Sequence, residues 1–435
     1  MSCISVPTIL MPKKGTDLSK WAVVACDQYT SQPEYWQKAD RIVGDAPSTL
    51  RLTLPEVYLE DADVSERTER IYDTMKQYLS DGTMIQFPAG FILTERWSGG
   101  EVPRRGLVTA VDLEAYEYKP GSRSLIRPTE KTVEERIPPR LAVRNGAVME
   151  LPHIMLLIDD PKRAIIEPLF EQLDLFEQVY DTDLMLDGGH INGWFIPQGV
   201  VTDTIISMFE GLNNRKTFNE KYHLTEDLPL LPFAVGDGNH SMATAKAYWE
   251  ALKPSLSEEE IATHPARFAL CEIVNIHDES LVIEPIHRVL FDADADNLFA
   301  AAKTFYAAHG ADCEITETAP ENAEDAHVFP FCTADCTGYV TMRKPQWGIA
   351  LATLQAFLDD YMSTRSAVKI DYIHGEDVVK ELGTKPNNIG FFLPDIEKND
   401  LFRGVILDGV LPRKTFSMGE AHEKRYYMEA KMIVK

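Results

Sequence analysis

Residues 231–241 read Leu231-Pro232-Phe233-Ala234-Val235-Gly236-Asp237-Gly238-Asn239-His240-Ser241. The apolar half of this stretch predicts a short buried strand, and the glycine-rich half predicts the turn that ends it. Residues 241–252 place an apolar side chain at every third or fourth position, which predicts a helix that ends before Pro254. The stretch therefore predicts a strand–loop–helix unit in the middle of the chain.

The turn of this unit carries the groups that a phosphate-binding site needs. A glycine-rich turn at the start of a helix leaves backbone N–H groups pointing outward, at the positive end of the helix dipole. Gly238 permits a ligand to approach the backbone closely. Asn239 and His240 can donate hydrogen bonds to phosphate oxygens, and Asp237 can bind Mg²⁺. The alternative is an ordinary helix start, in which Asp237 or Asn239 serves only as a cap.

The composition limits the partners of the protein. The chain has 435 residues, which suggests two or three domains, and a formal net charge of −25. Such an acidic surface repels phosphate backbones and anionic lipids, so we expect no nucleic-acid and no membrane partner. No apolar run is long enough for a transmembrane helix, and residues 1–7 do not resemble a signal peptide. Six cysteines without a disulfide pattern favour a reduced, cytoplasmic protein.

Predicted strands and helices alternate along the chain, which favours a mixed α/β (α+β) fold. Helices are expected at residues 63–79, with an Asp63–Glu66 capping box, at 161–179, at 296–308 and from Gly419 onward. Strands are expected at residues 21–26, 91–94, 106–118 and 153–158, and as two adjacent strands at 268–274 and 281–291.

The sequence contains no P-loop, no dinucleotide-binding glycine motif and no protein-kinase signature. The turn Asp237-Gly238-Asn239-His240 is instead similar to the DGHH(R) signature of the ParB/sulfiredoxin-like superfamily. Nearly the whole chain resembles the prokaryotic family known as domain of unknown function 1015. The other segments that carry this resemblance, in the same order, are residues 127–132, 190–194, 285–288, 370–375 and 411–415.

The free serine kinases of this superfamily have similar elements near the start, in the middle and near the C-terminus. They transfer a phosphoryl group from a nucleotide to free L-serine and produce O-phospho-L-serine. The resemblance implies a ParB/sulfiredoxin-like core and a Mg²⁺-dependent kinase with ATP or ADP as co-substrate. The alternative is a non-catalytic nucleotide-binding or sensing protein. A sulfiredoxin is disfavoured because Asn239 stands where that enzyme has a cysteine, and a DNA-binding ParB protein is disfavoured by the acidic charge.

The resemblance also implies roles for single residues. Glu130 matches the catalytic base, Asp237 matches the residue near the metal and phosphates, and His240 matches the phosphate-binding histidine. Further nucleotide- or phosphate-binding positions are Thr132, Gly238, Asn239, Ser241, Lys414 and Thr415, and the anion- or substrate-binding positions are His287 and Arg288. Without the resemblance, Glu130 would be a solvated carboxylate, Lys414 part of a surface loop, and Arg288 half of an ion pair.

The chain departs from the family signatures at three positions. Thr129 and Asn239 each replace a histidine, and Ser241 replaces an arginine that would bind phosphate. The expected regions are an N-terminal α/β region at 1–120, the nucleotide-binding core at 121–291, a further α/β region at 292–400, and a C-terminal segment at 401–435 that returns to the site. The expected partners are a nucleotide and a small amino acid, with a second copy of the chain as a further candidate.

Overall fold

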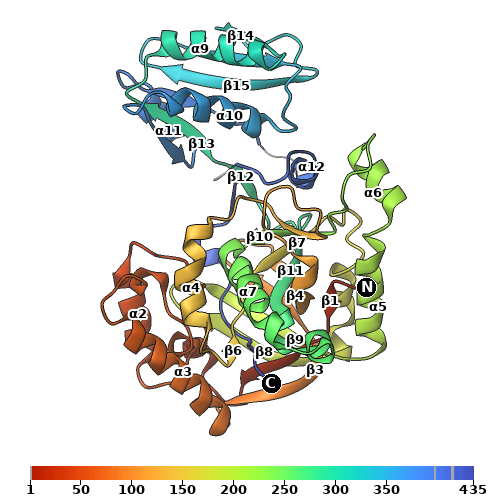
Figure 1. Cartoon of the computed structure of the whole chain (residues 1–435). Coiled ribbons are helices and arrows are strands. Elements are labelled where there is room, and N and C mark those ends of the chain that lie inside the picture. Colours follow the sequence, from red (N-terminus) through yellow and green to blue (C-terminus); the bar gives the residue numbers. More distant parts are fainter. Residues whose placement is uncertain (1, 396–397, 413–415) are drawn as a thin grey trace. The chain divides into compact units, whose positions relative to one another are not determined.

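The computed structural model describes residues 2–395, 398–412 and 416–435 and has a mixed α/β fold, as the sequence predicts (Figure 1). The chain forms two compact units. Unit 1 contains Met1–Pro128, Thr132–Leu281 and Gly419–Lys435, and unit 2 contains Thr129–Lys131 and Val282–Met418. The predicted residues Lys414 and Thr415 lie outside the described residues, and the ParB/sulfiredoxin-like core and the four-region division remain predictions.

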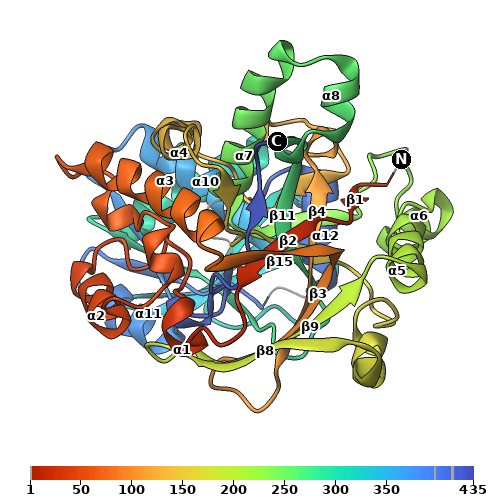
Figure 2. The same ribbon diagram turned by 90° about the horizontal axis from the view of Figure 1, so that it is seen from below.

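Unit 1 is built on a sheet with ten described strands, in the order β5-β10-β7-β11-β4-β3-β9-β8, with β1 added to β4 and β2 added to β3. Figure 2 shows β8, β9, β3 and β4 following one another along this sheet. The strands are β1 (Ile4–Ser5), β2 (Thr8–Pro12), β3 (Met84–Trp97), β4 (Arg104–Asp112), β5 (Ile126–Pro128), β7 (Met155–Ile158), β8 (Glu177–Leu184), β9 (Gly189–Pro197), β10 (Phe233–Asp237) and β11 (Phe268–Asn275). A separate pair joins β6 (Met149–Glu150) to β20 (Lys431–Met432).

Helices and loops cover this sheet and close one large apolar core. The side chains of Trp21, Trp36 and Trp249 are fully buried in it. The helices of unit 1 are α1 (Leu18–Trp21), α2 (Pro33–Val43), α3 (Val64–Ser80), α4 (Ile137–Arg144), α5 (Val200–Gly211), α6 (Arg215–Tyr222), α7 (Asn239–Leu252) and α8 (Glu258–Thr263). Burial of these apolar faces is the main force that holds the helices to the sheet.

Unit 2 has its own six-stranded sheet among its described residues, in the order β14-β16-β15-β18-β13-β17. Its core includes Val289, Cys332 and Val379. The elements of unit 2 are β12 (Ile283–Pro285), β13 (His287–Phe291), α9 (Ala295–Ala308), β14 (Asp312–Thr316), β15 (Ala326–Thr333), β16 (Thr337–Arg343), α10 (Ala350–Ser363), β17 (Lys369–Ile373), α11 (Glu376–Gly383), β18 (Ile389–Phe391), α12 (Lys398–Asp408) and β19 (Phe416–Met418). None of the helices in the described part of the chain is long and apolar enough to cross a bilayer.

The predicted strand–loop–helix unit is confirmed as β10, the Gly238 turn and α7. The predicted helices at 63–79 and 296–308 are also confirmed, as α3 and α9. Asp63 does precede α3, but its side chain makes no capping hydrogen bond. The prediction of a capping box there is therefore wrong.

Two predicted helices are wrong. Residues 161–179 form a 3₁₀ segment at Glu167–Leu175, and the chain then enters β8, where it pairs with β9. Pro168 interrupts the helical pattern, because proline lacks the donor that a helix interior needs. The C-terminal stretch from Gly419 is mostly extended, since its backbone groups bond to strands from the other end of the sequence, such as Leu10 with Ala430.

Two predicted strands are also corrected. Residues 21–25 are buried and Cys26 is half-buried, but among the described residues of this stretch only Val24 makes an isolated β-bridge, to Tyr426. The predicted strand at 281–291 splits into β12 and β13. Neither is adjacent to β11, which pairs with β4 and β7 in unit 1, whereas β13 pairs with β17 and β18 in unit 2. Apolar runs identify buried strands but not their partners.

Candidate functional site

The turn between β10 and α7 requires a glycine. Gly238 has a φ of +76°, which side chains other than glycine rarely tolerate. A Cβ atom there would lie 2.9 Å from Ile154 Cα and 3.1 Å from the His153 carbonyl oxygen. This tight packing against the segment that leads into β7 fixes the point where α7 begins. Among the described residues no side chain caps the first turn of α7, so its N–H groups remain available at the positive end of the helix.

His240 lies in the first turn of α7 and acts as a hydrogen-bond acceptor. Its Nε2 accepts the backbone N–H of Val133 at 3.3 Å. Burial, followed by the charges of Arg140 and Arg136, lowers the pKa of His240 to about 4. The ring is therefore neutral at pH 7, and its remaining proton on Nδ1 is the one it can donate to an anion. The neighbouring predicted residue Thr132 is buried beside this contact.

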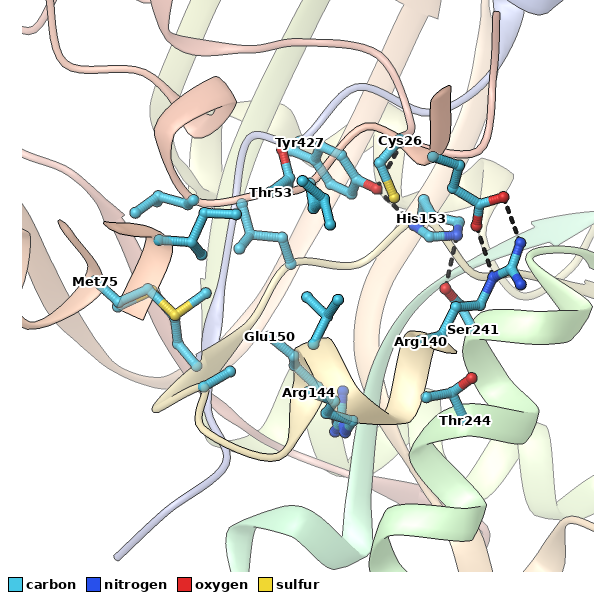
Figure 3. A pocket seen from close by; sticks show the side chains of 18 of the residues that line it. Cys26, Thr53, Met75, Arg140, Arg144, Glu150, His153, Ser241, Thr244 and Tyr427 are labelled. Carbon is cyan, nitrogen blue, oxygen red and sulfur yellow. Dashed lines mark hydrogen bonds and ion pairs between the residues drawn. The ribbon is translucent and has the colours of Figure 1, made fainter. Parts of the chain in front are cut away.

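A pocket of about 150 Å³ adjoins α7 and is shown in Figure 3. Ser241 and Thr244 reach it from the helix. Ser241 Oγ lies 2.7 Å from His153 Nε2, and His153 Nδ1 lies 2.7 Å from the Tyr427 hydroxyl. That hydroxyl also accepts the backbone N–H of Cys26 at 2.9 Å. The apolar part of the wall consists of Leu52, Leu54, Leu59, Ile71, Met75, Val143, Ala147, Met149 and Leu151.

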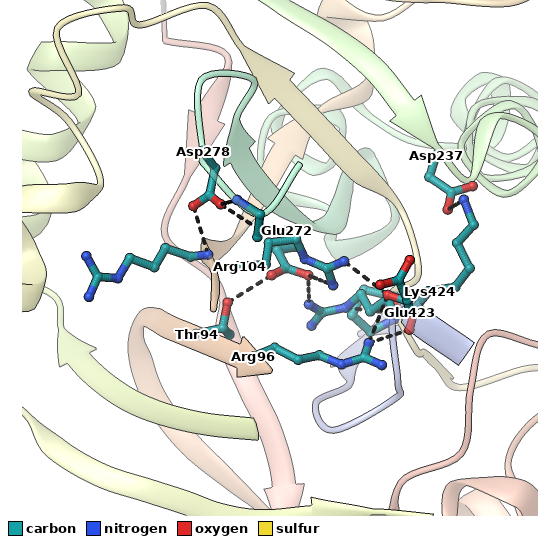
Figure 4. Close-up of polar contacts among 12 residues, drawn as sticks. Thr94, Arg96, Arg104, Asp237, Glu272, Asp278, Glu423 and Lys424 are labelled. Atoms are coloured by element: carbon teal, nitrogen blue, oxygen red, sulfur yellow. Dashed lines mark hydrogen bonds and ion pairs between the residues drawn. The ribbon is translucent and has the colours of Figure 1, made fainter. Parts of the chain in front are cut away.

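Asp237 faces a lysine from the C-terminal segment. Its Oδ2 lies 3.1 Å from Lys424 Nζ, and its Oδ1 accepts the Gly238 N–H at 2.8 Å (Figure 4). Burial acts to raise the pKa of Asp237, but Lys424 and the Gly238 N–H outweigh it, so the pKa lies below its ordinary value. Asp237 is therefore ionised at neutral pH, as a metal ligand must be.

A buried ionic network holds the segment that carries Lys424 (Figure 4). Arg425 bonds to Glu272 at 2.5 Å and to Glu429 at 2.7 Å, and its Nε donates to the Pro152 carbonyl at 3.0 Å. The side chains of Arg425 and Glu272 are each 4% exposed. Arg104 donates to the Glu423 carbonyl at 3.1 Å and adds a second cation near Glu272. The network thus anchors the backbone on both sides of Lys424.

The remaining predicted residues that the structure describes, Glu130, His287 and Arg288, lie in unit 2. Glu130 makes a β-bridge with Leu411. Arg288 is almost fully buried, donates from Nε to Gln355 at 2.8 Å, and lies over the ring of Tyr372. Burial lowers the pKa of His287, whose Nδ1 accepts the Leu393 N–H at 3.1 Å. These contacts engage His287 and Arg288 inside unit 2, and the anion-binding role that we expect for them remains a prediction.

Two observations bear on what could bind at the turn. Within the described residues, no three His, Cys, Asp or Glu side chains are grouped as a metal site. Mg²⁺ in nucleotide sites commonly takes only one or two carboxylates, with phosphate oxygens and water as the other ligands, and Asp237 fits that pattern. Asn239 Oδ1 is buried and accepts no hydrogen bond from the residues that the structure describes. A ligand that donates a hydrogen bond would satisfy it.

Sequence reasoning missed three residues that shape the site: His153, Lys424 and Tyr427. Each reaches the turn through a contact with a residue far away in the chain. Residues 424–427 concentrate two cations and two phenols in a short segment, which was the only local signal. The wrong prediction of a helix there concealed which side chains turn toward Asp237 and His153.

The chain matches the family described as "Protein of unknown function (DUF1015)" over residues 10–361. This match covers more than half of the chain, so the chain belongs to that family. No curated protein sequence matches it.

Several solved structures share similarity with the chain. One is a free serine kinase in complex with AMP, with 11% identity, 75% of this chain and 91% of that chain covered, and a TM-score of 0.35. Another is a conserved hypothetical protein from Pyrococcus furiosus, with 12% identity, 72% and 90% coverage, and a TM-score of 0.33. A third is SbnI with a C-terminal truncation from Staphylococcus aureus, with 9% identity, 72% and 83% coverage, and a TM-score of 0.36.

Replacing Gly238 with alanine should destabilise the protein by about 1–3 kcal/mol, because the new Cβ meets Ile154 and the positive φ is strained. Urea unfolding followed by circular dichroism measures this loss. Gly211→Ala is the matched control, since a Cβ at Gly211 meets no atom within 4 Å. Equal stabilities of the two variants would contradict the tight packing of the turn.

Replacing Arg425 with methionine should cost about 3–5 kcal/mol of unfolding free energy at pH 7, because Glu272 stays buried without its partner. Arg70→Met, which breaks only the exposed pair with Glu66, should change the stability by less than about 1 kcal/mol. Urea titrations at pH 7 measure the change in unfolding free energy of both variants.

The same network predicts a pH dependence. Burial acts to raise the pKa of Glu272, but Arg425 and Arg104 outweigh it and lower the pKa to about 2, below the ordinary 4.5. The stabilisation is therefore complete above pH 4.5 and is lost as the pH falls toward 2. The stability difference between the wild-type protein and Arg425→Met should narrow across this range, and a constant difference would contradict the assignment.

Proposed function

We propose that this protein is a Mg²⁺-dependent small-molecule kinase that transfers a phosphoryl group from ATP or ADP to free L-serine. The observation that carries the proposal is the Gly238 turn. It presents an uncapped helix end beside an ionised carboxylate, in a chain whose motifs follow the order found in free serine kinases. A second support is family membership over most of the chain.

Different groups at the turn would bind the nucleotide phosphates and Mg²⁺. The first-turn N–H groups of α7 and the Nδ1–H of His240 would hold the nucleotide phosphates. Asp237 would bind Mg²⁺, which supplies positive charge to the phosphates when bound. Lys424 lies at Asp237 and adds a cation to a protein whose net charge is −25. A local positive site of this kind is what an anionic substrate needs in so acidic a chain.

Glu130 would accept the proton of the serine hydroxyl. A carboxylate placed as a general base assists attack on the phosphoryl group, while the phosphate-binding groups stabilise the charge. In the sequence, Glu130 lies between Pro128, which pairs with Val235 of β10, and Val133, which donates to His240. Asn239 Oδ1, which accepts no hydrogen bond from the described part of the chain, suits a donor such as the ammonium group of a free amino acid.

Glu130→Gln should lower the rate of O-phosphoserine formation by about 100-fold or more, because the amide cannot accept the proton. The assay incubates the purified full chain with ATP or ADP, Mg²⁺ and L-serine, and quantifies O-phosphoserine by mass spectrometry. Nucleotide affinity, measured by calorimetry, should not change. Glu135→Gln, at an exposed carboxylate of the same charged run, is the matched control and should keep full activity.

His240→Ala should weaken binding of the Mg²⁺–nucleotide complex by about tenfold, the effect of losing one hydrogen bond to a charged group. Calorimetry measures the affinity, with His309→Ala in unit 2 as the control. An unchanged nucleotide affinity of the His240→Ala variant would show that the nucleotide phosphates do not bind at the start of α7. If nucleotide binds but no amino acid is phosphorylated, the chain is a nucleotide-binding or sensing protein instead.

A further inference from the structure

Ser241 is in a setting that its proposed role as a phosphate ligand does not explain. It occupies the position where the family signature has arginine, and its hydroxyl lies 2.7 Å from the imidazole of His153. It also lines the pocket beside α7 (Figure 3). A hydroxyl in hydrogen-bond contact with a base that a third group orients is the usual arrangement of an activated nucleophile.

The third group is Tyr427, which fixes the imidazole. Its oxygen accepts the Cys26 N–H at 2.9 Å and lies 2.7 Å from His153 Nδ1. We assign the ring proton of His153 to Nδ1, where the phenol oxygen can accept it. His153 Nε2 then carries the lone pair that accepts the Ser241 hydroxyl proton. Tyr427 is thus a positioning residue and His153 is the base.

The surroundings of Ser241 favour a negatively charged group on its oxygen. Ser241 lies in the first turn of α7, where the helix dipole and the uncapped N–H groups stabilise an anion. The guanidinium groups of Arg140 and Arg144 lie in the wall of the same pocket, where they pair with Glu56 and Glu150. The stabilisation of a phosphate ester on Ser241 would therefore come from the backbone N–H groups and the dipole of the helix. An acyl ester on the same oxygen would gain much less from these groups.

We propose that Ser241 is itself a phosphoryl acceptor, so that the protein phosphorylates its own helix α7 from a bound nucleoside triphosphate. Ser241 Oγ attacks the terminal phosphorus, and its proton passes to His153 Nε2. The bond from that phosphorus to the bridging oxygen breaks, and the nucleoside diphosphate leaves with the bonding pair. His153 then releases the proton to solvent. The proposal rests on the proposed function for its phosphoryl donor.

The modification would regulate the site in which it forms. A phosphate on Ser241 occupies the helix end that would otherwise bind the nucleotide phosphates, and it adds negative charge there. The phosphorylated protein should therefore bind nucleotide more weakly than the unmodified protein. Because serine replaces arginine, position 241 carries no charge before phosphorylation and a negative charge after it.

The experiment incubates the full-length protein with ATP and Mg²⁺, with and without L-serine. Intact mass spectrometry and phosphopeptide mapping then follow the protein, and O-phosphoserine is measured in the same samples. We expect one phosphoryl group, located on Ser241, in the wild-type protein and none at this position in Ser241→Ala. His153→Gln should slow the labelling by about 100-fold, because the base is lost. Ser257→Ala is the control, since the Ser257 hydroxyl also lies at a helix start but bonds to Glu260 instead of a histidine.

The outcomes separate this inference from the proposed function. Formation of O-phosphoserine without a phosphoryl group on Ser241 overturns the inference and leaves the kinase intact. Labelled Ser241 without O-phosphoserine supports the inference and overturns serine as the acceptor. Labelling that survives in Ser241→Ala, or that His153→Gln does not slow, overturns the roles assigned here. Absence of nucleotide binding in the wild-type protein overturns both proposals.

Discussion

The ion pair between Arg425 and Glu272 is the interaction on which the arrangement of unit 1 depends. It joins the C-terminal segment to β11 in the interior of the protein, where each charge requires a partner. The residues on either side of Arg425 then have little freedom. Lys424 is left beside Asp237, and Tyr427 is left beside His153. One buried contact therefore places two of the side chains that determine the chemistry of the turn.

The strand–loop–helix unit could be predicted because its signals are local. An apolar strand, a glycine that must adopt a positive φ and an amphipathic helix all lie within residues 231–252, and each agrees with the others. The mixed α/β class follows from the same kind of pattern. The prediction was wrong for residues 161–179. Their apolar residues are spaced as in a helix, but the segment forms a 3₁₀ helix followed by an edge strand.

The rest of the site could not be predicted, because it is formed by contacts over long distances in the sequence. Nothing near His153 in the sequence indicates that its two ring nitrogens will form hydrogen bonds with Tyr427 and Ser241. The same is true of Lys424, whose neighbours favoured a helix. The resemblance to a family predicted roles for Glu130, His240 and Asp237. Motif matching gave no information about the neighbouring side chains that determine their charge.

The position of residues 419–435 in the sequence also determines when the contacts of the site can form during synthesis. Residues 419–435 are the last part of unit 1 to be synthesised, yet they bond to Val23, Ala25 and Leu10, which are among the first. Until they emerge from the ribosome, Glu272 has no Arg425 and His153 has no Tyr427. The growing chain can collapse around its sheet, but the polar contacts of the turn with Lys424 and Tyr427 stay incomplete until residues 419–435 are made.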